Sequence, residues 1–240
     1  MSMWGSSPHP LDDYSMGGVR DTAVIRFFNA VYAWMAVGLA VTGLVSWWVS
    51  TDYQVLKSVN SPGALIGIFV AELVLVFVIS SAVRRLSAAA ATALFVLYAA
   101  LNGLLFSGIF ILYTKTSIAS AFGACAAMFA VMSVYGMFTK SDLTKLGKIL
   151  FMALIGLVVA TIINIFVATT MFNWIVSYAG VIIFAGLTAY DTQRLSQIAA
   201  QTQGDPTLAA RLSVNGALTL YLDFINMFLF LLRIMGDRKQ

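Results

Sequence analysis

Charged residues are scarce in this sequence, and histidine and cysteine are almost absent. Only 10% of the 240 residues are charged, whereas a typical soluble domain carries about 25%. The single histidine is His9, in a polar N-terminal stretch, and the single cysteine is Cys125, inside an apolar run. Histidine–cysteine zinc sites, disulfide frameworks and histidine-based catalytic triads are therefore excluded. We expect a protein that is not an enzyme and that needs no organic cofactor.

Hydrophobic residues, in contrast, make up 60% of the chain. A helix that crosses a bilayer needs about 20 apolar residues, and a charge at the bilayer centre is costly. Three uncharged runs are long enough to cross and are predicted as spans one, three and four: 27–51, 86–114 and 116–139. A longer uncharged run, 149–190, is predicted to hold spans five and six, because Thr169 and Thr170 in its middle favour a turn.

Two further apolar segments each contain one acidic residue. These are spans two and seven, near 63–83 with Glu72 and near 212–234 with Asp223. The sequence therefore predicts an all-α integral membrane protein, a bundle of seven transmembrane helices. We expect one domain over residues 27–236, embedded in the lipid bilayer and preceded by a polar, disordered cytoplasmic arm over residues 1–26.

Small residues recur at helix-packing spacing in two of these spans. The patterns are Gly63-x-x-x-Gly67 in span two and Gly103-x-x-x-x-Gly108 in span three. Glycines at such spacing let helix backbones approach closely in a membrane. We interpret these glycines as packing residues.

The distribution of basic residues predicts the orientation. With a cytoplasmic N-terminus, nine of the 14 Lys and Arg residues fall on the inner side, where membrane proteins retain them. The outer loops then hold only Lys57 and Lys115. Arg233, Arg238 and Lys239 oppose this bias if the last segment crosses fully, and the sequence leaves that crossing open. Because the net charge of +4 is spread over separate loops, a nucleic-acid partner is not expected.

Three acidic residues within or beside the spans are candidates for function, because ionisable groups inside a membrane are costly to keep. Asp191 ends span six, where it either pairs only with Arg194 or acts functionally. Asp223 lies about half-way along span seven, and Asn226 at i+3 shares its helix face. Glu72 either joins helices or lines a pore.

Two segments resemble the Bax inhibitor-1 family, also called transmembrane Bax inhibitor motif proteins. They are Phe184-Ala-Gly-Leu-Thr-Ala-Tyr-Asp-Thr-Gln-Arg194 and Ala217-Leu-Thr-Leu-Tyr-Leu-Asp-Phe-Ile-Asn-Met-Phe-Leu229. The resemblance covers about residues 25 to 236 and is strongest to the compact bacterial branch. It implies a central seventh helix wrapped by six others, location in a bacterial inner (plasma) membrane, and a pH-sensitive calcium leak.

The same resemblance implies roles for individual residues. Asp191 and Asp223 would form a hydrogen-bonded pair near the cytoplasmic side. An arginine at the inner end of span two would engage Asp191, and either Arg84 or Arg85 matches that position. Glu72 and Asn226 are the candidates for lining a pore or contacting the ion.

Elementary chemistry is consistent with a latch at the two aspartates. Two carboxylates at hydrogen-bonding distance in a poorly hydrated site cannot both ionise cheaply. Sharing one proton would tie spans six and seven together, whereas double ionisation would repel them. Carboxylate oxygens also suit Ca²⁺, although Asp191 and Asp223 offer fewer oxygens than a tight site needs. Weak, transient calcium binding is therefore predicted at Asp191 and Asp223.

Other functions use the same residues. An intramembrane aspartyl protease also pairs two aspartates, but that family has Gly-x-Gly-Asp where this chain has Leu220-Tyr-Leu-Asp223. A regulatory protein that transports nothing is the main alternative, binding a membrane partner such as a quality-control protease. A proton-coupled antiporter is distinguished from a leak only by flux measurements.

Overall fold

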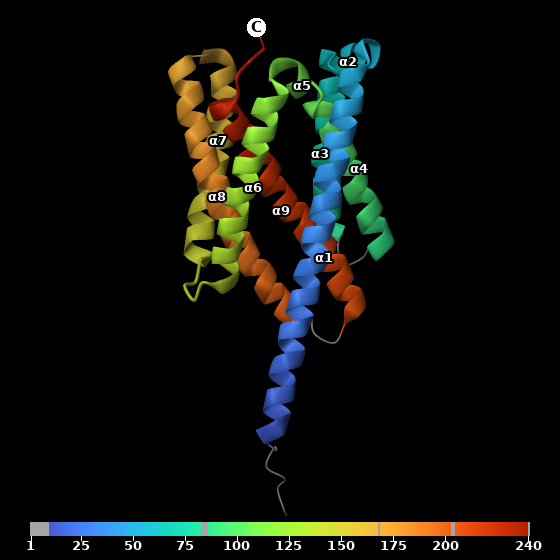
Figure 1. Ribbon diagram of the computed structural model, residues 1–240, viewed down its shortest axis with the longest axis vertical. Helices are drawn as coiled ribbons and strands as arrows, with labels where there is room; N and C mark the ends of the chain where they lie inside the picture. Colours follow the sequence, from blue (N-terminus) through green and yellow to red (C-terminus); the bar gives the residue numbers. More distant parts are fainter. Residues whose placement is uncertain (1–9, 83–85, 168, 203–204, 240) are drawn as a thin grey trace, which may run out of the picture.

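In a computed structural model, the chain forms a helical bundle (Figure 1). The structure describes residues 10–82, 86–167, 169–202 and 205–239. Over these residues seven helical segments are long and apolar enough to cross a bilayer. The helices are α1 (Pro10–Thr51), α2 (Tyr53–Val59), α3 (Pro62–Ala82), α4 (Ala88–Phe106), α5 (Ile109–Leu112), α6 (Lys115–Phe138), α7 (Thr144–Val167), α8 (Thr170–Gln201) and α9 (Pro206–Met235). The predicted class, an all-α seven-helix membrane bundle, is confirmed.

The predicted turn between spans five and six is also observed. α7 ends at Val167 and α8 begins at Thr170. The predicted third span differs, because it is divided into α4 and the short α5. At the break, the Ser107 hydroxyl donates to the Leu104 carbonyl at 2.7 Å and accepts from the Asn60 amide at 3.2 Å. These polar contacts stabilise a bend that hydropathy alone does not indicate.

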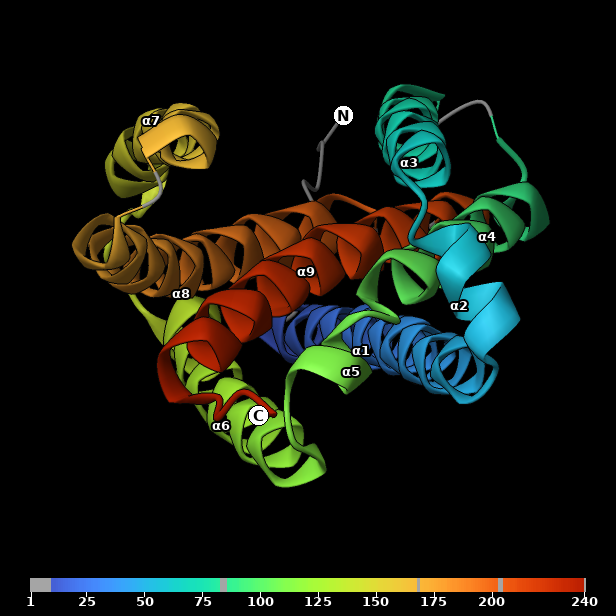
Figure 2. The same ribbon diagram turned by 90° about the horizontal axis from the view of Figure 1, so that it is seen from above.

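The last helix lies at the centre of the bundle. α9 packs mainly against α1, α4, α6 and α8, and much of its length is buried. α3 packs on α4, and α7 packs on α8. Viewed along the helices, α3 and α7 stand on one side of the α8–α9 pair, and α1 and α6 stand on the other (Figure 2). The central seventh helix is therefore confirmed, with four principal neighbours among the other spans.

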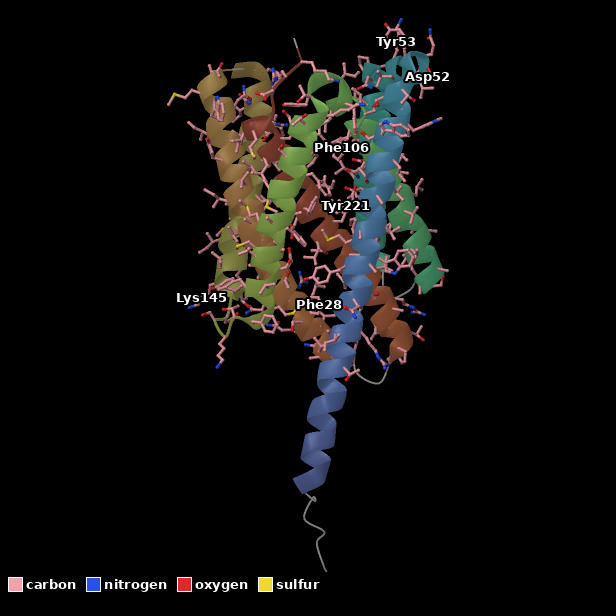
Figure 3. All side chains as sticks on the ribbon, viewed as in Figure 1. Phe28, Asp52, Tyr53, Phe106, Lys145 and Tyr221 are labelled. Atoms are coloured by element: carbon pink, nitrogen blue, oxygen red, sulfur yellow. The ribbon has the colours of Figure 1, made fainter. Side chains whose placement is uncertain are left out.

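The two ends of the bundle are distinct. α1 begins at Pro10, so the helix starts well before the boundary predicted at residue 27, and its first part projects beyond the other helices (Figure 1). Lys145 lies at that N-terminal end, and Asp52 and Tyr53 lie at the opposite one (Figure 3). α9 has 30 residues, about 45 Å at 1.5 Å per residue. It brings the C-terminus to the end opposite α1's projecting part, as a fully crossing helix does.

The predicted packing role of the glycines holds for only some of them. A Cβ atom on Gly103 would lie 2.8 Å from the Thr42 carbonyl oxygen, so α1 and α4 touch there. Gly63 and Gly67 have nothing within 4 Å of such an atom, and their face of α3 contacts no other helix of this chain. The closest backbone approach is at Gly136 of α6, which lies directly against the Ala189 backbone of α8.

A methyl group at Gly136 should force α6 away from α8. We expect Gly136→Ala to destabilise the protein by about 1–3 kcal/mol, because overpacking against backbone cannot be relieved by a rotamer change. The measurement is the apparent Tm in detergent micelles. Gly156→Ala is the matched control, since nothing lies within 4 Å of its Cβ position. A parental Tm for Gly136→Ala would contradict the close α6–α8 packing.

Candidate functional site: a carboxyl pair between two helices

Asp191 of α8 and Asp223 of α9 meet between the two helices. Their side chains are in hydrogen-bonding contact. An ionised carboxylate can only accept, so a hydrogen bond between two carboxyl groups requires a proton on one of them. The contact joins two helices that pack extensively along their length. The two aspartates predicted from the sequence are thus brought together by the fold.

The environments of the two aspartates differ. Asp223 is buried at 5% exposure, and its Oδ2 atom is buried without a hydrogen-bond partner. Asp191 is partly exposed, and the positive charge of Arg194 stabilises its ionised form. An unpaired ion is costly in an apolar interior. Asp223 therefore depends on Asp191 for its partner, whereas Asp191 has a nearby cation as well.

The residues around Asp191 orient α8, because successive helical positions point about 100° apart. The Tyr190 ring lies over Gly147 of α7. Thr192 donates to the Ser133 hydroxyl of α6 at 3.4 Å. Gln193 bonds to the backbone of the α6–α7 connection, donating to Ser141 and accepting from Leu143. Neighbours on three sides thus hold Asp191 toward α9.

Sequence reasoning assigned no role to Thr192 or Gln193. The signal that could have found them is a run of polar residues, Asp191 to Arg194, on an otherwise apolar helix. Such a run cannot face lipid on every side, so each side chain needs a partner on a different neighbour. A polar contact between helices also lies near Asp223: the Tyr221 hydroxyl of α9 is 2.7 Å from the Thr42 hydroxyl of α1.

A cavity of about 870 Å³ opens beside the carboxyl pair. It lies between α7, α8 and α9, and both aspartates line it together with Arg194, Thr219 and Asn226. The predicted sharing of one face by Asp223 and Asn226 is therefore observed. The Asn226 amide nitrogen donates to the Leu222 carbonyl at 2.8 Å, which leaves its carbonyl oxygen as an acceptor beside the cavity.

Glu72 lines a second cavity, of about 630 Å³, between α3, α4 and α9. The Glu72 side chain is 7% exposed, and its Oε1 atom is buried without a hydrogen-bond partner. Tyr98, Asn102 and Asn226 line the same cavity. The structure thus brings Glu72 and Asn226 to one cavity but does not bring Glu72 to the aspartate pair.

The two cavities follow one another along α9. Leu222 and Asn226 line both of them, and these residues follow the helical spacing of one face. The face is the one on the side of α3 and α7 (Figure 2). The acidic residues of the spans therefore border two adjacent cavities along one face of the central helix.

The predicted arginine partner of Asp191 is not placed. Arg84 and Arg85 lie outside the described residues. Within the described part of the chain, Arg194 is the cation whose charge acts on Asp191. The sequence predicted for Arg194 only an ion pair with Asp191 at the membrane interface. The structure gives it a place in the lining of the cavity beside the pair.

Asp142, in the α6–α7 connection, does not join the candidate site. Its carboxylate accepts from the backbone of Thr144 at 2.9 Å at the start of α7. Hydrogen bonds from the Thr144 side chain and backbone lower the pKa of Asp142 below its usual value. Such a carboxylate stays ionised at neutral pH and adds no pH dependence there.

Among the described residues, no group of three or more His, Cys, Asp or Glu side chains gathers as a metal site would require. Ca²⁺ takes six to eight oxygen ligands in tight sites. The aspartate pair supplies four carboxyl oxygens at most, one of them protonated when the pair shares a proton. Asp191 and Asp223 alone therefore supply too few oxygens for a high-affinity calcium site.

Seven bundled spans with a carboxyl pair at the central helix define an integral membrane protein of a specific class. The family described as "Inhibitor of apoptosis-promoting Bax1" matches residues 24–240. The chain belongs to this Bax inhibitor-1 family, as its two aspartate-bearing segments predicted.

Several bacterial relatives align over almost the whole chain. The inner membrane protein YbhL of Escherichia coli is 49% identical over 224 residues, covering 92% of this chain and 96% of the relative. An uncharacterised protein of Deinococcus radiodurans is 45% identical, covering 90% and 92%. An uncharacterised protein of Borreliella burgdorferi is 39% identical, covering 90% and 93%.

Proposed function

We propose that this protein is a pH-sensitive calcium leak channel gated by the Asp191–Asp223 pair. One observation carries the proposal: the two carboxyl groups are in contact between α8 and α9 and border a cavity on the central helix. The proposal needs no catalytic step and no organic cofactor. Calcium is the transported ion and only a transient ligand.

The gate operates by proton sharing. With one proton, the pair forms a hydrogen bond that links α8 to α9 in a site of low polarity, where such a bond is strong. When both groups ionise, two negative charges at contact distance repel each other. The helices then separate at this point, and the repulsion favours the open state as pH rises. Arg194 moderates the repulsion because its charge acts on Asp191.

The conducting route follows the cavities along α9. Asn226 lies between the aspartate pair and Glu72 and lines both cavities. Carboxylate and amide oxygens are ligands that suit Ca²⁺. Conduction requires an ion to be bound weakly enough to leave. Separated single oxygens along a face meet that requirement better than a closed site.

The N-terminal end of the bundle is proposed to face the cytoplasm. Nine of the 14 basic residues then belong to the cytoplasmic side, in agreement with the positive-inside bias. The aspartate pair would lie toward that side. The printed name of the Escherichia coli relative, an inner membrane protein, supports a bacterial inner membrane.

Calcium flux into liposomes tests the function. Purified protein is reconstituted with a calcium-sensitive dye inside the vesicles, and influx is followed from about pH 5 to about pH 9. We expect influx that rises with pH. Empty liposomes and liposomes carrying an unrelated helical membrane protein are the controls. Influx no greater than that of empty liposomes at every pH would contradict the leak.

A further inference from the structure

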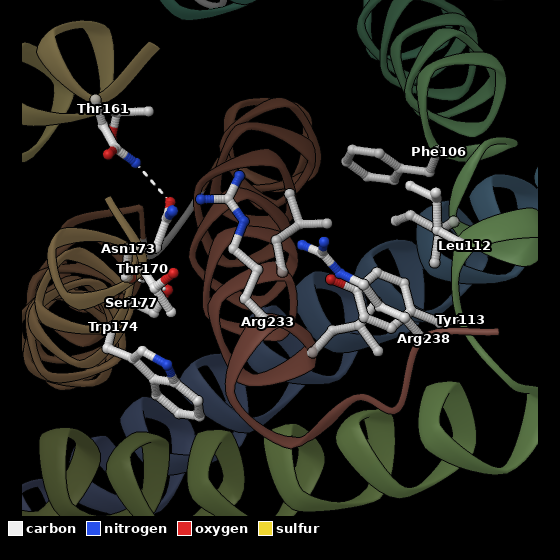
Figure 4. A pocket seen from close by; sticks show the side chains of 14 residues that line it. Phe106, Leu112, Tyr113, Thr161, Thr170, Asn173, Trp174, Ser177, Arg233 and Arg238 are labelled. Carbon is white, nitrogen blue, oxygen red and sulfur yellow. Dashed lines mark hydrogen bonds between the residues drawn. The ribbon is translucent and has the colours of Figure 1, made fainter. Parts of the chain in front are cut away.

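The C-terminal end of the bundle carries basic residues where the positive-inside bias disfavours them. Because α9 crosses fully, Arg233 and Arg238 lie at the end opposite the N-terminus. Both line a third cavity, of about 780 Å³, between α5, α7, α8 and α9. Figure 4 shows the two guanidinium groups reaching into this one space from different segments. The positive-inside bias disfavours basic residues at this end of the bundle, so two arginines at one cavity there suggest a functional role.

Backbone hydrogen bonds fix the segment that carries Arg238. After α9 ends, the chain pairs with the segment that follows α5. The Thr114 amide donates to the Asp237 carbonyl at 3.3 Å, and the Lys239 amide donates to the Leu112 carbonyl at 3.0 Å. The Asp237 amide also donates to the Ser117 hydroxyl at 3.0 Å. The terminal segment is thus anchored, which holds Arg238 beside Tyr113.

A contact within α9 positions the Arg233 side chain. Its guanidinium lies 5.5 Å from the centre of the Phe230 ring, one turn earlier on α9. Cation–π contact of this kind orients a guanidinium and leaves its N–H groups free to donate at the edge. Both cations are therefore positioned before any ligand arrives.

The lining offers these cations no counter-charge. None of its described residues is acidic, and the neighbouring Asp237 is exposed and outside the lining. Two of the neutral donors are already used, since Thr161 donates to Leu157 and Asn164 donates to Asn173. The Asn164 carbonyl oxygen, in contrast, is buried without a partner. The described lining of the cavity therefore has no anion but has a spare acceptor for a hydroxyl group.

We propose that this cavity binds a phosphate group through Arg233 and Arg238. Guanidinium groups match phosphate oxygens in bidentate geometry. The Asn164 acceptor suits a protonated phosphate oxygen or a headgroup hydroxyl. Phe106, Leu112 and other apolar residues complete the lining, as the boundary between headgroup and acyl chains requires. The phosphate comes either from a phospholipid headgroup or from free phosphate, which share this chemistry.

This inference goes beyond the calcium leak and does not depend on it. The phosphate site lies toward the C-terminal end of α9, where Arg233 is ten residues beyond Asp223, and its argument uses only charge and geometry. A protein without flux can still bind phosphate, and a conducting protein can fail to do so. The binding test below therefore separates the two proposals.

Binding is measured with delipidated protein in detergent micelles. In one arm phosphatidylglycerol is added and retained lipid is counted by native mass spectrometry, with phosphatidylcholine for comparison. In the other arm inorganic phosphate is titrated calorimetrically. We expect saturable binding in at least one arm, and about tenfold or greater weakening in the double variant Arg233→Gln with Arg238→Gln, because charged hydrogen bonds to phosphate are the strong ones.

Lys57→Gln with Lys115→Gln is the matched control. It removes the same charge at the same end from two exposed side chains outside the cavity, and it should bind like the parent. Saturation only by phosphatidylglycerol identifies a lipid site, and saturation by inorganic phosphate identifies a site for the free anion. Binding in neither arm, or equal binding by the parent and the arginine variant, would overturn the proposal.

A second variant covers the case in which the arginine variant does not fold. Thr170→Glu leaves both arginines intact and adds a carboxylate at an exposed position of the lining. The new charge should compete with phosphate for the guanidinium groups and weaken binding by about tenfold. Parental affinity in a folded Thr170→Glu protein would likewise overturn the site.

Discussion

Asp191→Asn and Asp223→Asn should each abolish the pH dependence of calcium influx. Each variant removes one ionisable group but keeps a side chain of the same size that can hydrogen-bond, so the fold should survive. Without a second negative charge the two side chains cannot repel each other, and the opening at alkaline pH should disappear. We expect influx in either variant to change by less than about twofold from about pH 5 to about pH 9.

The double variant sharpens this test. Residues that act as one unit are not additive, so Asp191→Asn with Asp223→Asn should add little to either single change. Asp142→Asn is the matched control, because it removes a carboxylate at the same end that contacts neither aspartate. If both single variants keep the parental pH midpoint, the carboxyl pair joins the helices but does not gate them, whatever calcium influx remains.

Glu72→Gln should lower the calcium influx reached at alkaline pH, where the Glu72 carboxyl group is ionised, without moving the pH midpoint. Glu72 lines the cavity that follows the aspartate pair along α9, and its Oε1 atom has no protein partner. Removing a negative charge from the route weakens its attraction for a divalent cation, whereas the gate is unchanged. We expect a loss of about tenfold, which corresponds to a loss of about 1.4 kcal/mol in the attraction of the route for the ion.

The control for Glu72→Gln is Asp52→Asn. Asp52 accepts from the backbone at the start of α2 and is exposed, and asparagine serves equally well as a helix cap. This variant therefore removes one negative charge without touching the route. Parental influx in Glu72→Gln would place the route elsewhere, and a shifted midpoint would show that Glu72 belongs to the gate.

The spans were predictable because charged side chains are costly in the bilayer core and are therefore rare in membrane-spanning segments. Uncharged runs located the crossing segments, and two threonines in the middle of a long uncharged run marked the turn between α7 and α8. The break at Ser107 was not predictable, since it depends on Asn60 from another helix. The start of α1 at Pro10 was not predictable from hydropathy, because the residues before 27 are too polar to indicate a membrane span.

The aspartate pair was predicted from two specific segments, and the fold places both members in the lining of one cavity. The cavities were not predictable, because they depend on α3 and α7 standing away from α9. Helix spacing places Asp223 and Asn226 on one face, but it does not say which neighbour leaves that face open. The cavity at the C-terminal end was equally hidden, since hydropathy gives no indication that Arg233 and Arg238 converge.

The central claim is that double ionisation of the pair separates α8 from α9. Double electron–electron resonance tests this claim directly. It measures the distance between spin labels attached at Ala200→Cys and Ala210→Cys in a Cys125→Ala background. Both label positions are exposed, one near the end of α8 and one near the start of α9. The distance should lengthen as pH rises, with the midpoint of calcium influx, and should stay constant in Asp223→Asn. A distance that is independent of pH while influx rises would contradict the gate.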